Sequence, residues 1–115
     1  MGTNEMMMLQ KDFTGVGFIK SRKSEGRVMD MAVEMIERAE RMHLTITNVI
    51  VDRSSGMDID RKKIDELVAA MEKESVDAIM IRSLTEISNN RDDIKVFLDI
   101  ADKCGVSVFA MNEDE

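Results

Sequence analysis

The segment KSRKSEGR, residues 20–27, places two serines among four cations. It lies between an apolar run, VGFI, and a stretch with apolar residues at helical spacing, so it is predicted to be a loop that opens a helix. A hydroxyl at such a junction can be exposed, and a neighbouring guanidinium can stabilise the anion that develops during its attack. Ser24 is therefore a candidate nucleophile, and Arg22 is a candidate ligand for the charged group that it attacks.

A second polar loop follows the next apolar run. The segment TITNVIVD, residues 45–52, is rich in β-branched residues, and the DRSSG that starts at its last residue is typical of a loop. The candidates here are Asp52, Ser55 and Arg61, and further cations surround them at Arg53, Lys62 and Lys63. A local excess of positive charge at a helix N-terminus attracts phosphate, even in a chain whose formal net charge is −7. Phosphate chemistry is the leading functional class.

Each candidate also has an ordinary structural explanation. Because serine is strongly preferred at helix N-caps, a capping role for Ser24 is favoured over a nucleophilic one by roughly three to one on local sequence alone. Asp52 can cap or form a salt bridge at a strand end, and Ser55 can simply form a turn. Arg61 can be a solvated helix residue. The local sequence leaves both explanations open.

The apolar pattern predicts strands that alternate with amphipathic helices. The predicted strands are residues 16–19, 45–52, 77–81 and 106–111, and the predicted helices follow apolar residues within 28–42, 64–71 and 94–101. Asp58 or Asp60 is expected to cap the second helix, and Gly105 is expected to end the third. This alternation predicts an α/β fold: a small, doubly wound, mostly parallel four-stranded sheet with helices on both faces. The loops that follow its strands gather at one edge, where ligands bind.

Length and composition fit one soluble domain. A chain of 115 residues, 43% hydrophobic and 34% charged, can bury one core. We expect residues 1–15 to form an N-terminal extension, residues 16–111 to form the domain and residues 112–115 to form an acidic tail.

Several classes of function are excluded by composition. No run of about eighteen apolar residues is present to cross a bilayer, and the N-terminus lacks the pattern of a secretory signal. The expected compartment is therefore the cytoplasm, and no membrane partner is predicted. One cysteine and one histidine cannot make a zinc site, so neither a metal nor another cofactor is predicted.

Two motifs and the order of the elements resemble the catalytic domain of the serine recombinases, the resolvase and invertase family. The first family motif is Tyr-x-Arg-x-Ser, and KSRKS keeps Arg22 and Ser24 at that spacing, with Lys20 in place of the tyrosine. The second is Asp-x-x-Ser-Gly followed five residues on by Arg, and DRSSGMDIDR, residues 52–61, matches it. The resemblance extends over about residues 16–111.

In this family the serine attacks a DNA phosphodiester and becomes joined to a 5′-phosphate, while arginines neutralise the transition state. The resemblance implies that Ser24 is the nucleophile and that Arg22 and Arg61 hold the phosphate. It gives Ser55 and Asp52 the role of supporting the loop. It therefore implies site-specific cleavage and rejoining of DNA strands.

The third family motif is replaced in this chain. After the third strand the family carries Leu-Asp-Arg-Leu-x-Arg, whose acid and two arginines complete the active site, whereas this chain has LTEISN, residues 84–89. Thr85 stands for the acid, and Glu86 and Asn89 stand for the two arginines. One lost donor costs roughly 3 kcal/mol of transition-state stabilisation, so two lost donors predict cleavage slower by about four orders of magnitude. A degenerate or weakly active recombinase domain is the resulting prediction, and whether it is an enzyme stays open.

The expected partners are DNA and other protein subunits. Family members continue past the fourth strand into a long helix that pairs subunits and a DNA-binding region, and the printed chain ends before them. We therefore expect weak DNA affinity, together with self-association or association with another recombinase subunit. The alternative function is a noncatalytic interaction or regulatory module. A domain for a small phosphorylated ligand also fits the fold, but the chain has no Gly-rich fingerprint.

Overall fold

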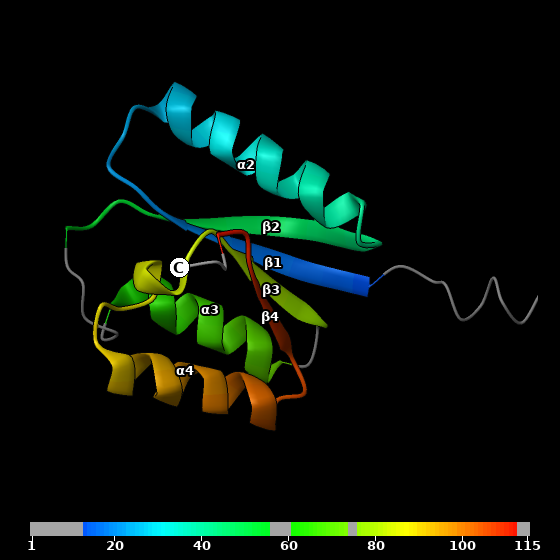
Figure 1. The fold of residues 1–115 in the computed structure, drawn as a ribbon, viewed down its shortest axis with the longest axis vertical. Helices are drawn as coiled ribbons and strands as arrows, with labels where there is room; N and C mark the ends of the chain where they lie inside the picture. Colours follow the sequence, from blue (N-terminus) through cyan, green and yellow to red (C-terminus); the bar gives the residue numbers. More distant parts are fainter. Residues whose placement is uncertain (1–12, 56–60, 74–75, 113–115) are drawn as a thin grey trace, which may run out of the picture.

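The computed structural model describes residues 13–55, 61–73 and 76–112. Four strands form one sheet in the order β2-β1-β3-β4, and every neighbouring pair is parallel (Figure 1). The strands are β1 (Phe13–Lys20), β2 (Leu44–Asp52), β3 (Ala78–Ile81) and β4 (Ser107–Ala110). The predicted doubly wound α/β fold is confirmed.

Helices cover both faces of the sheet (Figure 1). Helix α2 packs on one face, and α3 and α4 pack on the other. The bounds are α2 (Glu25–Glu40), α3 (Lys62–Glu72) and α4 (Arg91–Lys103), with a short 3₁₀ helix, η1 (Leu84–Glu86), between β3 and α4. No described helix is long and apolar enough to span a membrane.

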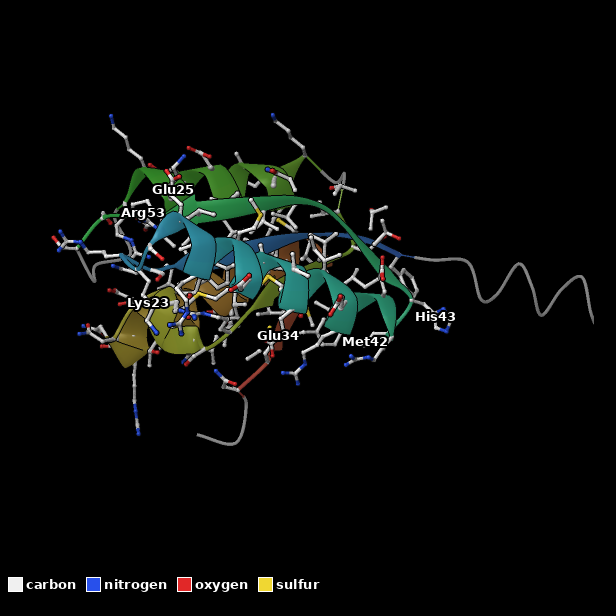
Figure 2. The ribbon with its side chains drawn as sticks, turned by 90° about the horizontal axis from the view of Figure 1, so that it is seen from above. Lys23, Glu25, Glu34, Met42, His43 and Arg53 are labelled. Atoms are coloured by element: carbon white, nitrogen blue, oxygen red, sulfur yellow. The ribbon has the colours of Figure 1, made fainter. Side chains whose placement is uncertain are left out.

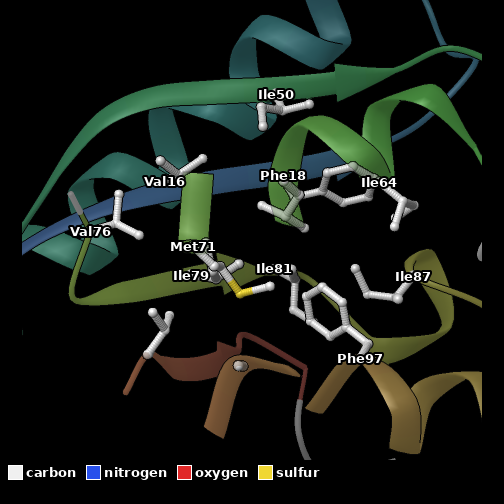
Figure 3. Packing of buried hydrophobic residues seen from close by; sticks show 13 residues of the cluster. Val16, Phe18, Ile50, Ile64, Met71, Val76, Ile79, Ile81, Ile87 and Phe97 are labelled. Atoms are coloured by element: carbon white, nitrogen blue, oxygen red, sulfur yellow. The ribbon is translucent and has the colours of Figure 1, made fainter. Parts of the chain in front are cut away.

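The two faces have separate apolar cores because the sheet divides them. Under α2, Met35 and Ala39 are buried against Ile19 of β1 and Met80 of β3. The larger core lies between the sheet and the other two helices, where the Phe18 and Phe97 side chains have no exposed surface (Figure 3). All four residues of β3 are buried, as expected for an inner strand covered on both faces.

The ends of several elements differ from the predictions. β1 begins at Phe13 instead of Val16, so the strand takes in three residues that were expected in the N-terminal extension. Its first residues pair with β2 from Phe13 opposite Leu44, a tertiary contact that the local sequence does not reveal. Gly105 follows α4 with a φ of +72°, which confirms its predicted role in ending that helix. The predicted caps at residues 58 and 60, and the rest of the extension and of the acidic tail, lie outside the described residues.

A close approach between β1 and β3 gives a test of the sheet. A Cβ added at Gly15 would lie 2.7 Å from the Ala78 carbonyl oxygen and 2.9 Å from Leu44 Cδ1. Because a strand carbonyl cannot move aside, Gly15→Ala is expected to lower the free energy of unfolding by about 1–3 kcal/mol, measured by urea denaturation. Gly26→Ala is the control, since nothing lies within 4 Å of the added Cβ. An unchanged urea midpoint for Gly15→Ala would contradict the described register.

Candidate functional site

The carboxyl ends of β1, β2 and β3 meet at one edge of the sheet. The Ser21 amide, just after β1, donates to the Asp52 carbonyl of β2 at 3.0 Å. Arg82, just after β3, donates from Nη2 to the Lys20 carbonyl at 3.2 Å. The residues predicted to do chemistry therefore follow strands that end beside one another, as a parallel sheet requires.

Arg61 and Asp52 form a buried ion pair at this edge. The Arg61 Nε donates to Asp52 Oδ2 at 2.6 Å, and the two residues are only 8% and 2% exposed. The same guanidinium donates to main-chain oxygens beyond β3, from Nη1 to Ile87 at 3.1 Å and from Nη2 to Glu86 at 2.7 Å. Arg61 therefore joins the loop after β2 to the loop after β3.

The Asp52 carboxylate is stabilised in its charged form. Burial alone would raise the pKa of this carboxyl, but hydrogen bonds from Ser54 and the charge-assisted bond from Arg61 outweigh that effect. The Ser54 amide donates to Asp52 Oδ1 at 2.9 Å. The pKa of Asp52 consequently lies below its ordinary value.

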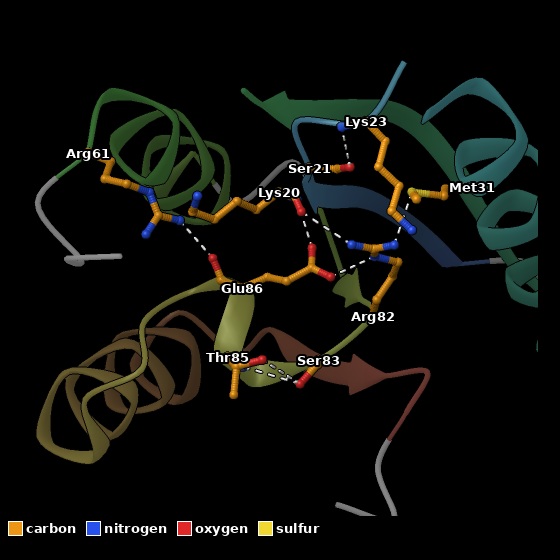
Figure 4. A network of polar contacts seen from close by, with 9 residues as sticks. All are labelled: Lys20, Ser21, Lys23, Met31, Arg61, Arg82, Ser83, Thr85 and Glu86. Atoms are coloured by element: carbon orange, nitrogen blue, oxygen red, sulfur yellow. Dashed lines mark hydrogen bonds and ion pairs between the residues drawn. The ribbon is translucent and has the colours of Figure 1, made fainter. Parts of the chain in front are cut away.

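The Glu86 carboxylate lies among the strand ends, between the Lys20 backbone and the Arg82 side chain (Figure 4). Its Oε1 accepts from the Lys20 amide at 2.7 Å, and its Oε2 accepts from Arg82 Nε at 2.6 Å. The side chains of Glu86 and Arg82 are only 12% and 25% exposed. Thus an internal anion is bound by a strand-end amide and a guanidinium, which are the kinds of donor that bind phosphate.

The other inward cations also have internal acceptors. The Lys20 Nζ donates to the Ser54 carbonyl at 2.6 Å, and Arg82 Nη1 lies 3.0 Å from Met31 Sδ on α2 (Figure 4). Together with Arg61, these side chains stabilise the edge by contacts within the chain. Arg61 and Arg82 each also have a carboxylate partner, so the charge of these two side chains is compensated within the protein.

The remaining predicted site residues lie on exposed loops. Ser24 is the N-cap of α2, and its Oγ accepts from the Arg27 amide at 3.3 Å, which confirms the capping explanation. Arg22 and Ser55 are exposed, and Lys23 lies near the same end of α2 (Figure 2). The hydrogen bond of the Ser24 hydroxyl lies within α2, whereas the Arg61 contacts described above lead to Asp52 and to the loop after β3. The structure thus brings Asp52 and Arg61 into contact, and it leaves Arg22, Ser24 and Ser55 exposed to solvent.

The sequence analysis missed Arg82 as a member of this cluster. A signal was present, because Arg82 directly follows the buried run AIMI and must therefore lie at the carboxyl edge. The segment that stands for the third family motif begins two residues later, at Leu84. Among the described residues, no group of three or more His, Cys, Asp or Glu side chains is placed to hold a metal ion.

The cap at Ser24 predicts a measurable loss of stability. Ser24→Ala removes the acceptor for the Arg27 amide and is expected to lower the free energy of unfolding by about 1 kcal/mol, measured by urea denaturation. Ser24→Asp is the matched control, because aspartate is an equally good N-cap, and it is expected to keep the wild-type stability. Equal losses in both variants would show that the hydroxyl has another structural role.

Comparisons with known proteins agree with this fold. The family model described as "Resolvase, N terminal domain" matches residues 20–115. The C-terminal catalytic domain of ISC1926 TnpA, an IS607-like serine recombinase, has a similar structure with a TM-score of 0.77 at 17% identity, over 89% of this chain and 69% of that one. The N-terminal catalytic domain of TP901-1 integrase gives 0.70 at 18% identity, over 87% and 78% of the two chains. A serine recombinase from Sulfolobus solfataricus gives 0.65 at 14% identity, over 91% and 71%. The search of curated proteins by sequence gave no match.

Proposed function

The chain belongs to the resolvase N-terminal domain family, and from that membership we propose that it is a serine recombinase domain with strongly reduced strand cleavage. One observation supports the proposal that strand cleavage is reduced. The Glu86 carboxylate occupies the centre of the strand-end edge, 2.7 Å from the Lys20 amide and 2.6 Å from Arg82 Nε. The position that the family pattern fills with an arginine holds an anion here, which repels a phosphodiester and engages donors that could bind it.

The proposed chemistry is attack by Ser24 on a DNA phosphodiester. The Ser24 oxygen forms a bond to phosphorus, the bond from phosphorus to the 3′ oxygen breaks, the serine proton is lost, and the departing oxygen takes up a proton. Ser24 is exposed at the N-terminus of α2, the end of a helix that favours an anion. Arg22 is exposed two residues away and can approach the phosphate. The resemblance implied that Arg61 also holds the phosphate, but Arg61 is 8% exposed and its guanidinium is bonded to Asp52 and to the loop after β3, so the proposed role of Arg61 is to support the site.

DNA is the proposed partner, bound weakly by the domain alone. The exposed cations of the two loops are Arg22, Lys23 and Arg53, with Arg27 in the first turn of α2 and Lys62 at the start of α3. Nonspecific affinity depends on the number of phosphates neutralised, and so few cations in a chain of net charge −7 give little of it at physiological salt. Cleavage then requires that another subunit or region holds the DNA in place.

A covalent adduct is the direct test. The full chain is incubated with supercoiled and with nicked DNA, alone and with an intact homologous recombinase, and protein-linked DNA is separated on a denaturing gel. A weak adduct that is lost in Ser24→Ala supports the proposal. An adduct that persists in Ser24→Ala would show that another residue is the nucleophile.

A noncatalytic interaction module is the second candidate. It is favoured by the complete internal pairing of the Glu86 carboxylate and by large apolar side chains exposed on α2, namely Met29 and Val33. Failure to detect any adduct, with tight binding of the folded wild-type chain to the intact recombinase, would support this module in place of the enzyme.

A further inference from the structure

β2 is an edge strand with unusual sequence. It is nine residues long and has β1 on one side, and no described strand lies on its other side. The stretch LTITNVIV, residues 44–51, holds no charge and no proline. Natural edge strands are often short or carry charges that discourage pairing with another chain, and the stretch 44–51 of β2 has neither of these two features.

An apolar groove runs beside this edge. It has a volume of about 360 Å³ and lies between α2 and β2, where Met29, Ala32, Val49 and Val51 contribute to its walls. Met29 is 64% exposed, and Val33, one helical turn further along α2, is 45% exposed. Met31 lies on the opposite flank of α2 against Arg82, so Met29 and Val33 belong to the flank that faces the free edge of β2.

The surface formed by the free edge of β2 and the exposed flank of α2 carries side chains of opposite charge at its two ends. Glu25 and Arg53 lie together at one end of α2 and β2, and the turn with His43 lies at the other end (Figure 2). Glu40 and Arg41, both exposed, close the helix at that second end. A second copy in antiparallel orientation would place Arg53 near Glu40 of its partner and Glu25 near Arg41.

We propose that two copies of this chain associate through β2 and α2 about a twofold axis near Thr47 and Asn48. The register between β1 and β2 shifts at this point, which makes a bulge in the middle of β2. With the bulge on the axis, residues 44–46 of one copy lie opposite residues 49–51 of the other. The two sheets become one, and the two α2 helices lie side by side on the same face, so that their exposed apolar flanks cover each other. This interface does not depend on cleavage by Ser24.

The first experiment measures the oligomeric state of the full chain by sedimentation over a range of concentrations. The wild type is expected to dimerise. Val33→Lys and the double variant Thr45→Lys/Asn48→Lys are each expected to weaken the dimer at least tenfold, since each places charge in the interface. Val96→Lys is the matched control, because Val96 is 52% exposed on α4 at the other face of the sheet, and it is expected to leave the dimer unchanged. Urea denaturation checks that each variant folds, and the strand variant keeps the test valid if the helix variant does not.

The second experiment tests the position of the axis. Asn48→Cys in a Cys104→Ala background is expected to cross-link to itself with a short bis-maleimide. Phe109→Cys in the same background lies on β4 at the opposite edge and is expected to remain uncross-linked. A monomeric wild type, or cross-linking through position 109 and not through position 48, would overturn the proposal.

Discussion

Glu86→Arg is expected to raise the yield of the covalent Ser24–DNA adduct by about a hundredfold or more. The substitution removes the carboxylate that the Lys20 amide and Arg82 hold, and it places a cation where the family pattern has one. One donor aimed at developing charge contributes about 10²–10³ in rate, and release of Arg82 from its ion pair adds a second cation near the phosphate. The measurement is the fraction of labelled DNA that migrates with protein on a denaturing gel, with the intact recombinase supplied.

Glu86→Gln is the matched control for that prediction. It removes the negative charge and retains an oxygen that can accept from the Lys20 amide, but it adds no cation. Its adduct yield is expected to lie between those of the wild type and Glu86→Arg, and Ser24→Ala combined with Glu86→Arg is expected to give none. Equal yields from the Gln and Arg variants would mean that removal of the anion accounts for the whole effect. A folded Glu86→Arg variant with no adduct would contradict the proposed attack by Ser24.

Arg61→Met is expected to lower the free energy of unfolding by about 3–5 kcal/mol. The change leaves the buried Asp52 carboxylate without its ion-pair partner, and removal of one member of a buried pair has a cost of this size. It also removes the donors to the Glu86 and Ile87 carbonyls, so the loop after β3 loses its connection to β2. Urea denaturation at neutral pH measures the loss.

Asp52→Asn is the control for Arg61→Met, and it also tests how the free energy of unfolding depends on pH. Combined with Arg61→Met, it is expected to cost less than the sum of the single changes, because neither half of the pair is left charged and alone. The pKa of Asp52 is lower in the folded chain than in the unfolded one. Its stabilisation is therefore present above the unfolded value, near 3.8, and is lost as the pH falls through the lower folded value. Asp52→Asn is expected to flatten this acid limb, and an unchanged limb would contradict the role of the carboxylate.

The elements that could be predicted are those whose buried positions give the local sequence an apolar run or an apolar repeat. β3 is buried on both faces, so AIMI is uniformly apolar, and α2 is recognisable because Val28, Met35 and Ala39 recur on its buried flank. The start of β1 has no such apolar pattern. Gly15 is present there because the Ala78 carbonyl approaches too closely for a side chain, a reason that exists only in the assembled sheet.

The site could be predicted only in part. The second motif singled out Asp52 and Arg61, but the ion pair between them was not predicted, whereas the preference of serine for N-caps correctly described Ser24. The direction of the Glu86 side chain could not be predicted, because it depends on the Lys20 amide, a donor that every residue type would present. The role of Arg82 depends in the same way on β1 and β3 being neighbours in space.

Arg61 holds the loop after β3 by the carbonyl oxygens of Glu86 and Ile87, and carbonyls are the same whatever side chains follow them. These hydrogen bonds therefore hold the loop in place whatever side chain residue 86 carries. Position 86 can therefore change between an acidic, an amide and a basic side chain, by natural variation or by design. The backbone of the loop keeps its position in each case.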